Sequence, residues 1–85
     1  MRADENQGRI IKALREIGAS VIVLSQVGGG CPDILVGYRG INYLMEIKGP
    51  RGKLSERQIA FHESWRGGEI NVIRSVGQAI KTIGG

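Results

Sequence analysis

The chain has few of the residues that form cross-links, metal cages or membrane spans. Its 85 residues include one cysteine and one histidine, and only 5% are aromatic. One cysteine cannot form an internal disulfide, and one Cys with one His cannot supply the roughly four ligands of a structural zinc site. No apolar run approaches the ~18 residues of a membrane span, and the first residues lack the apolar region of a signal peptide. We therefore expect a cytoplasmic protein.

Glycine and positive charge are the two features in excess. The chain has 14 Gly, a net charge of +4 and a pI near 9.7. The basic balance weakly favours a polyanionic partner such as nucleic acid. The length predicts a single domain over residues 1–85. A core this small favours a second subunit, because a short chain buries only about 60–65% of the surface that its unfolded form exposes.

Hydrophobic periodicity predicts an α/β fold. Apolar residues at helical spacing indicate a first helix, and a short β-branched run is typical of a strand buried on both faces. Alternating residues around a glycine-containing turn predict a β-hairpin. The expected elements, in chain order, are a helix over 4–17, a strand over 21–24, a hairpin over 33–48, a helix over 55–66, a strand over 70–74 and a helix over 75–83. This αβββαβα order predicts a mixed sheet flanked by helices.

The hairpin register carries the chemical information. If Arg39-Gly40 are the two turn residues, Asp33 lies opposite Glu46, and their β-carbons are about 4.5–5.5 Å apart. Lys48 follows two residues later and projects from the same face. Opposed like charges destabilise a hairpin, whereas a hard cation such as Mg²⁺ takes carboxylate oxygens. The pattern therefore indicates a metal site suited to a phosphate substrate.

A purely structural interpretation of these residues is also open. Glu46 and Lys48 would then be an exposed pair at the end of a strand, and Asp33 would cap a turn. Two other functional classes fit the composition: a non-catalytic basic DNA-binding module and a small dimeric assembly protein.

The segment GGGCPDILVGYRGINYLMEIKG resembles the PD-(D/E)XK nuclease signature. With LSERQIAFHESWRGG and INVIRSVGQAI, the whole chain resembles the compact virus-type replication-repair nuclease (VRR-NUC) domain of phages and prophages. The resemblance implies a restriction-endonuclease-like αβββαβ core and a Mg²⁺- or Mn²⁺-dependent, structure-selective DNA endonuclease. It further implies a homodimer acting on branched double-stranded DNA in the bacterial cytoplasm. Four-way (Holliday) junctions are the expected substrate, with flaps or other branched DNA as the alternative.

The resemblance also assigns roles in the site. It implies that Asp33, Glu46 and the backbone carbonyl of Ile47 bind the metal and that Lys48 is the catalytic lysine. Glu5 is the best match to an acidic residue that the family carries on its first helix. It could equally be a solvated first-turn residue that favours the helix dipole.

Gln58 has two possible roles. The segment Ser55-Glu56-Arg57-Gln58 reads as a capping box, in which Gln58 bonds back to the Ser55 amide. The family instead places a glutamine of this helix beside the active site. We favour the active-site role and expect that one rotamer cannot serve both fully.

Residues around this motif are candidates for other contacts. We expect Phe61 and Trp65 to pack, and His62 to be a surface or packing residue. The apolar surface of the first or the last helix is the expected dimer interface. The candidate DNA contacts are Arg39, Arg51, Lys53, Arg57, Gly29 and Gly30.

Overall fold

The computed structural model describes residues 3–84, and its element order is the predicted αβββαβα. The helices are α1 (Ala3–Glu16), α2 (Glu56–Ser64) and α3 (Val76–Thr82). The strands are β1 (Ser20–Val23), β2 (Ile34–Tyr38), β3 (Ile41–Ile47) and β4 (Ile70–Ile73). Within these described residues, no helix combines the length and apolarity that a membrane crossing requires.

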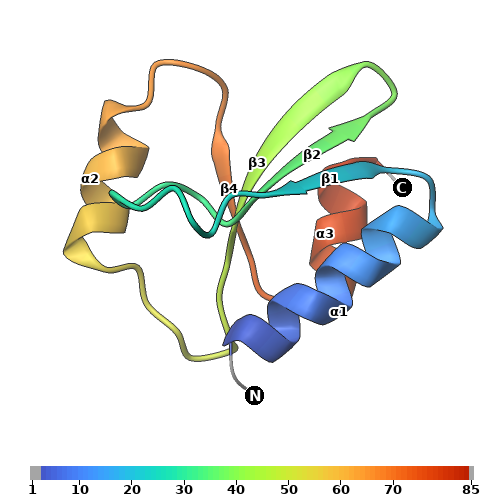
Figure 1. Ribbon diagram of the computed structural model, residues 1–85, viewed down its shortest axis with the longest axis horizontal. Helices are drawn as coiled ribbons and strands as arrows, with labels where there is room; N and C mark the ends of the chain where they lie inside the picture. Colours follow the sequence, from blue (N-terminus) through green and yellow to red (C-terminus); the bar gives the residue numbers. More distant parts are fainter. Residues whose placement is uncertain (1–2, 85) are drawn as a thin grey trace.

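The strands form one mixed sheet between two helical layers. The strand order is β1-β2-β3-β4, with β1 and β2 antiparallel to their neighbours and β4 parallel to β3. Helices α1 and α3 lie together on one face, while α2 stands on the other (Figure 1). The α/β architecture with a mixed, helix-flanked sheet is therefore confirmed.

The hairpin has the predicted register. Tyr38 lies opposite Ile41, and Ile34 lies opposite Met45. Arg39 and Gly40 both have positive φ, at 49° and 81°. This pair of left-handed residues matches a two-residue turn whose twist suits adjoining strands. The turn thus sets which side chains of β2 and β3 share a face.

The hydrophobic core lies between the sheet and the α1/α3 layer. Apolar side chains of α1, of α3 and of the residue that caps α3 are buried there against the inner face of the sheet, among them Ile10, Leu14, Ala79 and Ile83. Their burial leaves these helices little apolar surface for a partner. That one of these helices supplies a dimer interface stays a prediction.

Strand β1 corrects another expectation. The β-branched run at 21–24 predicts a strand buried on both faces, but β1 is an edge strand, and Ile22 and Val23 are 58% and 48% exposed. Only Val21 of this strand is buried. The short apolar pattern is the same for a central strand and an edge strand, so it could not distinguish them.

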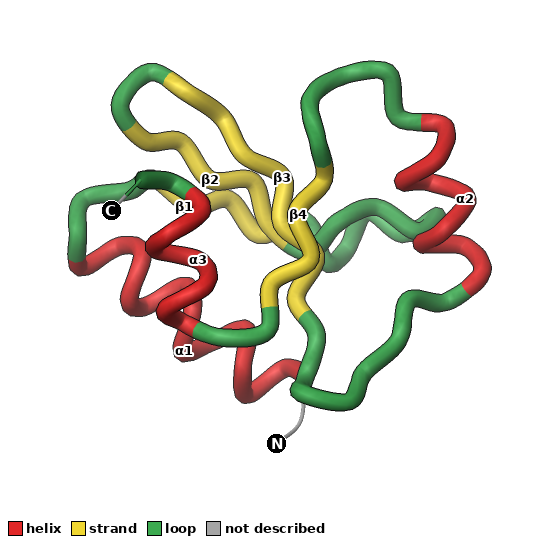
Figure 2. The backbone as a smooth tube through the Cα atoms, turned by 180° about the vertical axis from the view of Figure 1, so that it is seen from behind, coloured by secondary structure: helices red, strands yellow, loops and turns green. Residues whose placement is uncertain are grey.

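Helix α2 is held differently from the other helices. None of its residues is fully buried, and long loops join it to β3 and β4 (Figure 2). It ends at Ser64, earlier than predicted, because Trp65 already has extended backbone angles. The loop before β2 contacts it closely: a Cβ added to Gly30 would lie 2.3 Å from the Arg57 carbonyl oxygen. Glycine at position 30 thus permits the loop to dock against the first turn of α2.

This contact predicts different effects for two neighbouring glycines. Gly29 and Gly30 both have positive φ, but a Cβ on Gly29 meets no atom within 4 Å. Gly29→Ala should cost only the backbone penalty of about 1 kcal/mol, or roughly 4–8 °C in melting temperature. Gly30→Ala should lower the melting temperature further and speed amide hydrogen exchange across 55–64. Equal effects of the two substitutions would contradict this account of α2 docking.

Candidate active site

Asp33 and Glu46 lie opposite each other at the open end of the hairpin. The Asp33 amide donates to the Met45 carbonyl at 3.1 Å, which extends the strand pairing one residue beyond β2. The Asp33 side chain is fixed by the Ile47 amide, which donates to Oδ2 at 2.7 Å. The predicted opposition of the two acids is therefore present, and the Ile47 backbone lies beside them.

The burial of Glu46 is unusual for this face of the sheet. Glu46 is 0% exposed. Leu44, two residues earlier on the same face, and its cross-strand partner Leu35 are only half-buried. The pKa of Glu46 is raised to about 8, mainly by burial and then by the hydrogen bond and the charge of Asp33. The charge of Lys48 acts in the opposite direction and lowers it. A carboxylate held in this way is costly to the fold unless a cation balances it.

Lys48 lies next to the acid pair, as the strand alternation predicts. Its charge acts on both Glu46 and His62, although β3 has ended one residue earlier. The Lys48 amide donates to the Ile73 carbonyl at 3.0 Å and so continues the pairing with β4. The side-chain stem runs beside Gly52, where an added Cβ would contact it at 3.4 Å.

Gln58 completes the capping box and also lies against the acid pair, the two positions between which the sequence left a choice. Its Oε1 accepts from the Ser55 amide at 2.8 Å, and the Gln58 amide donates to Ser55 Oγ, so the capping box is complete. Its Nε2 donates to Glu46 Oε2 at 3.2 Å. The expectation that the two roles compete is wrong, because they use opposite ends of the amide. The cap in fact orients the amide so that its donor faces the carboxylate.

His62 is a site neighbour that the sequence interpretation missed. Its Nε2 lies 3.4 Å from Glu46 Oε1, one helical turn after Gln58. Burial, followed by the charge of Lys48, lowers the pKa of His62, which favours the neutral ring. The i, i+4 spacing puts His62 on the same helix face as Gln58, and this is the signal in the sequence that could have identified it.

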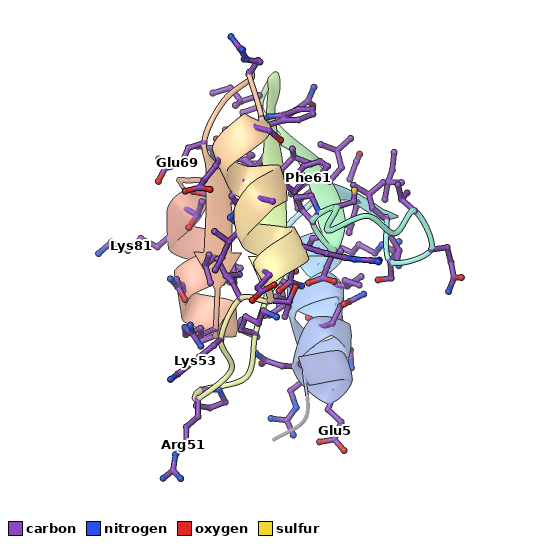
Figure 3. All side chains as sticks on the ribbon, turned by 90° about the vertical axis from the view of Figure 1, so that its left-hand side faces the viewer. Glu5, Arg51, Lys53, Phe61, Glu69 and Lys81 are labelled. Carbon is purple, nitrogen blue, oxygen red and sulfur yellow. The ribbon has the colours of Figure 1, made fainter. Side chains whose placement is uncertain are left out.

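Glu5 does not reach the acid pair. It is exposed and points away from the body of the molecule, at the same end as Arg51 and Lys53 (Figure 3). Asn6 turns inward instead and is 3% exposed. Its Nδ2 donates to the Lys48 carbonyl at 2.8 Å and to the Arg74 carbonyl at 3.0 Å. The helix therefore presents an amide, one residue after the predicted acid, to the backbone of the site. Asn6 lies four residues before Ile10 and extends the buried stripe, a spacing visible in the sequence.

The loop after Lys48 is held by Arg74, an arginine that was not among the predicted site residues or DNA contacts. Arg74 Nη1 donates to the carbonyls of Gly49 and Gly52 at 2.8 and 2.7 Å. These contacts leave the side chains of Arg51 and Lys53 exposed. Both are free to meet a phosphate, and DNA contact by these residues stays a prediction.

The other candidate DNA contacts occupy two separate places. Arg39 lies at the hairpin tip, about 17 Å along the strands from Asp33, with its guanidinium 5.0 Å from the centre of the Tyr38 ring. Gly29, Gly30 and Arg57 lie where the glycine loop meets α2. Gly30 is occupied by packing against the Arg57 backbone, whereas the Arg57 side chain is exposed.

Phe61 and Trp65 pack together as expected, and Cys31 lies within the influence of the acid pair. Cys31 is half-buried, and burial with the charges of Glu46 and Asp33 raises the pKa of its thiol. Phe61 and Trp65 stack with ring centres 5.6 Å apart. Trp65 also lines a cleft of about 320 Å³ with Leu35, Asn42, Leu44, Gly68 and Glu69.

The donor set suits a hard divalent cation. Two carboxylates share one site, and the charge of Asp33 helps raise the pKa of Glu46, a strain that a bound cation relieves. Across residues 3–84, no group of three or more His, Cys, Asp or Glu side chains has metal-binding geometry. The protein side of a metal site here would consist of the acid pair and backbone oxygen, with water completing the shell.

The αβββαβ core with an acid pair and a lysine at the base of its hairpin has the arrangement of PD-(D/E)XK nucleases. A solved structure described as a VRR_NUC domain matches with a TM-score of 0.71 and 33% sequence identity, over 93% of this chain and 95% of that chain. No protein-family model and no curated protein matches the chain. The chain belongs to the VRR_NUC family and is a nuclease domain.

The raised pKa of Glu46 predicts a stability that depends on pH and metal. Because the folded-state pKa lies above the ordinary value of 4.5, metal-free protein should lose stability as pH rises from about 4.5 to about 8. Glu46→Gln lacks this charge, so in EDTA at pH 8 it should melt about 5–10 °C higher than the wild type, with the difference vanishing near pH 4.5. Mn²⁺ should raise the melting temperature of the wild type alone. A lower melting temperature for Glu46→Gln at pH 8 would mean that the carboxylate serves the fold.

Proposed function

We propose that this nuclease domain is a Mg²⁺- or Mn²⁺-dependent, structure-selective DNA endonuclease that hydrolyses phosphodiester bonds. The observation that carries the proposal is the fully buried Glu46, opposite Asp33 and next to Lys48, in a place where apolar neighbours are less buried. Two opposed carboxylates, one of them fully buried, do not by themselves stabilise a fold. Activity needs them, because carboxylate oxygens hold the cation that phosphodiester hydrolysis uses.

Each residue then has a role set by its place. Asp33, Glu46 and the Ile47 carbonyl would hold the cation, which would supply an activated water and neutralise charge on the phosphate. Lys48 would stabilise negative charge as it builds on the phosphate oxygens. Gln58 would hold Glu46 through Oε2. Glu5 has no part in this scheme, because its side chain is exposed and points away from the body of the molecule.

Branched DNA, with four-way junctions as the first choice and flaps as the alternative, is the proposed substrate. The exposed cations Arg51, Lys53 and Arg57 lie on segments that adjoin Lys48 and Gln58, where they would contact phosphates. Such contacts position DNA without reading its sequence. A second copy of the chain would supply the second site that paired cuts across a junction need.

Cleavage of a panel of linear, flap and four-way-junction DNAs tests the catalytic proposal. We expect cutting of branched DNA in Mg²⁺ or Mn²⁺ and none in EDTA. Lys48→Ala should lower the cleavage rate about 10²–10³-fold while junction binding persists. Lys81→Ala removes the same charge from exposed Lys81 on α3 and should cut normally. Wild-type protein that binds junctions but never cuts them with either metal would favour the non-catalytic DNA-binding alternative.

The exposed edge of the sheet favours β1 as the surface of the proposed homodimer. Ile22, Val23 and Val27 are 58%, 48% and 66% exposed, and β1 has an unpaired edge. Ile22→Lys should therefore weaken self-association at least tenfold in sedimentation velocity. Ile41→Lys changes an equally exposed residue (54%) at the hairpin tip and should not. Monomeric wild-type protein at micromolar concentration, with or without junction DNA, would contradict the dimer.

A further inference from the structure

Helix α2 approaches Glu46 with two polar side chains from one face. Gln58 Nε2 donates to Oε2 at 3.2 Å, and His62 Nε2 lies 3.4 Å from Oε1. The two residues are spaced i, i+4, so both oxygens of a single carboxylate are met by nitrogens one helical turn apart.

Packing does not explain the position of His62. No residue of α2 is fully buried, so the helix is not anchored by an apolar face. The aromatic contact on this helix is made by Phe61, which stacks on Trp65. The His62 ring, 16% exposed, is directed at a side chain that is 0% exposed. The contact with the Glu46 carboxylate therefore accounts for the position of the ring.

Rotation of the carboxylate gives this contact a function. The terminal torsion of a glutamate is broad, so a single donor such as Gln58 leaves the plane of the Glu46 carboxylate free to rock. A second donor on the other oxygen fixes that plane. Each carboxylate oxygen has two acceptor sites, so both donors leave lone pairs available to a cation.

We propose that His62 is a positioning residue, which donates its Nε2 proton to Glu46 Oε1 and holds the carboxylate in the orientation that binds the metal. The inference rests on the proposed function and names a residue that this site uses beyond the acid pair, Lys48 and Gln58. Partners that orient metal-binding groups are worth about 10–100-fold in metal affinity or activity.

The test measures Mn²⁺ binding to the intact protein by calorimetry, without DNA, alongside cleavage. His62→Leu keeps the bulk but removes the donor, and it should weaken Mn²⁺ binding about 10–100-fold. The Mn²⁺ concentration that half-activates cleavage should rise to match, with the melting temperature in EDTA little changed. His62→Gln restores an N–H donor of similar reach and should recover binding to within a few-fold. Glu63→Gln, exposed on the same helix, is the matched control and should behave as the wild type.

The outcomes separate this inference from the proposed function. If the wild type binds Mn²⁺ and cuts DNA, and His62→Leu does both equally well, the positioning role is wrong and the nuclease assignment stands. If His62→Gln is as impaired as His62→Leu, ring shape matters and donation does not, which also overturns the inference. If the wild type neither binds Mn²⁺ nor cuts DNA, the metal-dependent function fails, and the role of His62 fails with it.

Discussion

The burial of one carboxylate against another, Glu46 against Asp33, is the constraint on which this small structure depends. A hairpin with opposed acids and a fully buried glutamate works against folding, and other parts of the chain limit that cost. The Arg39-Gly40 turn fixes the register that opposes the acids. The Ile47 amide binds one acid, and α2 supplies nitrogens to the other. A shift of one residue in the hairpin would send the pair to opposite faces and remove the reason for all of these contacts.

Helix α2 and the acid pair depend on each other. A helix with no buried side chain gains little from the hydrophobic effect, so its polar contacts with Glu46 and the close approach at Gly30 matter more to its position. In return, the capping box turns the Gln58 amide so that its donor faces the carboxylate. Local helix chemistry thus sets the geometry of a contact made across the fold. A change in the charge of Glu46, whether by protonation or by a bound cation, would directly alter the contacts that hold α2, the helix that carries Arg57.

Sequence reasoning succeeded where the geometry is local and failed where it depends on tertiary packing. Alternation and a two-residue turn determine a hairpin register almost completely, so the pattern of residues alone could bring Asp33, Glu46 and Lys48 together. Whether β1 lies at an edge depends on the strand order of the whole sheet, and a run of β-branched residues does not contain that information. On the first helix the prediction missed by one residue: Glu5 offered the right chemistry, but Asn6, four residues before Ile10, is the residue that faces inward. His62 was missed because a lone histidine has no partner in sequence, and its partner Glu46 lies 16 residues away on a strand.

The inward position of Asn6 also bears on how the site would hold a cation. An ionised acid there could not donate to the Lys48 and Arg74 carbonyls, so the observed backbone arrangement requires a hydrogen-bond donor, which the Asn6 amide supplies. Among the side chains that the structure describes, the first helix adds no acid, and the acid pair supplies the only carboxylates at the site. Affinity for a hard cation rises with the number of charged ligands and with the rigidity of the site. If only two carboxylates hold the proposed cation, rigidity would have to contribute more. The structure restrains both acids: the Ile47 amide binds Asp33, while Gln58 and His62 approach the two oxygens of Glu46. Under the proposed function, the precision with which the two acids are held would take the place of a third.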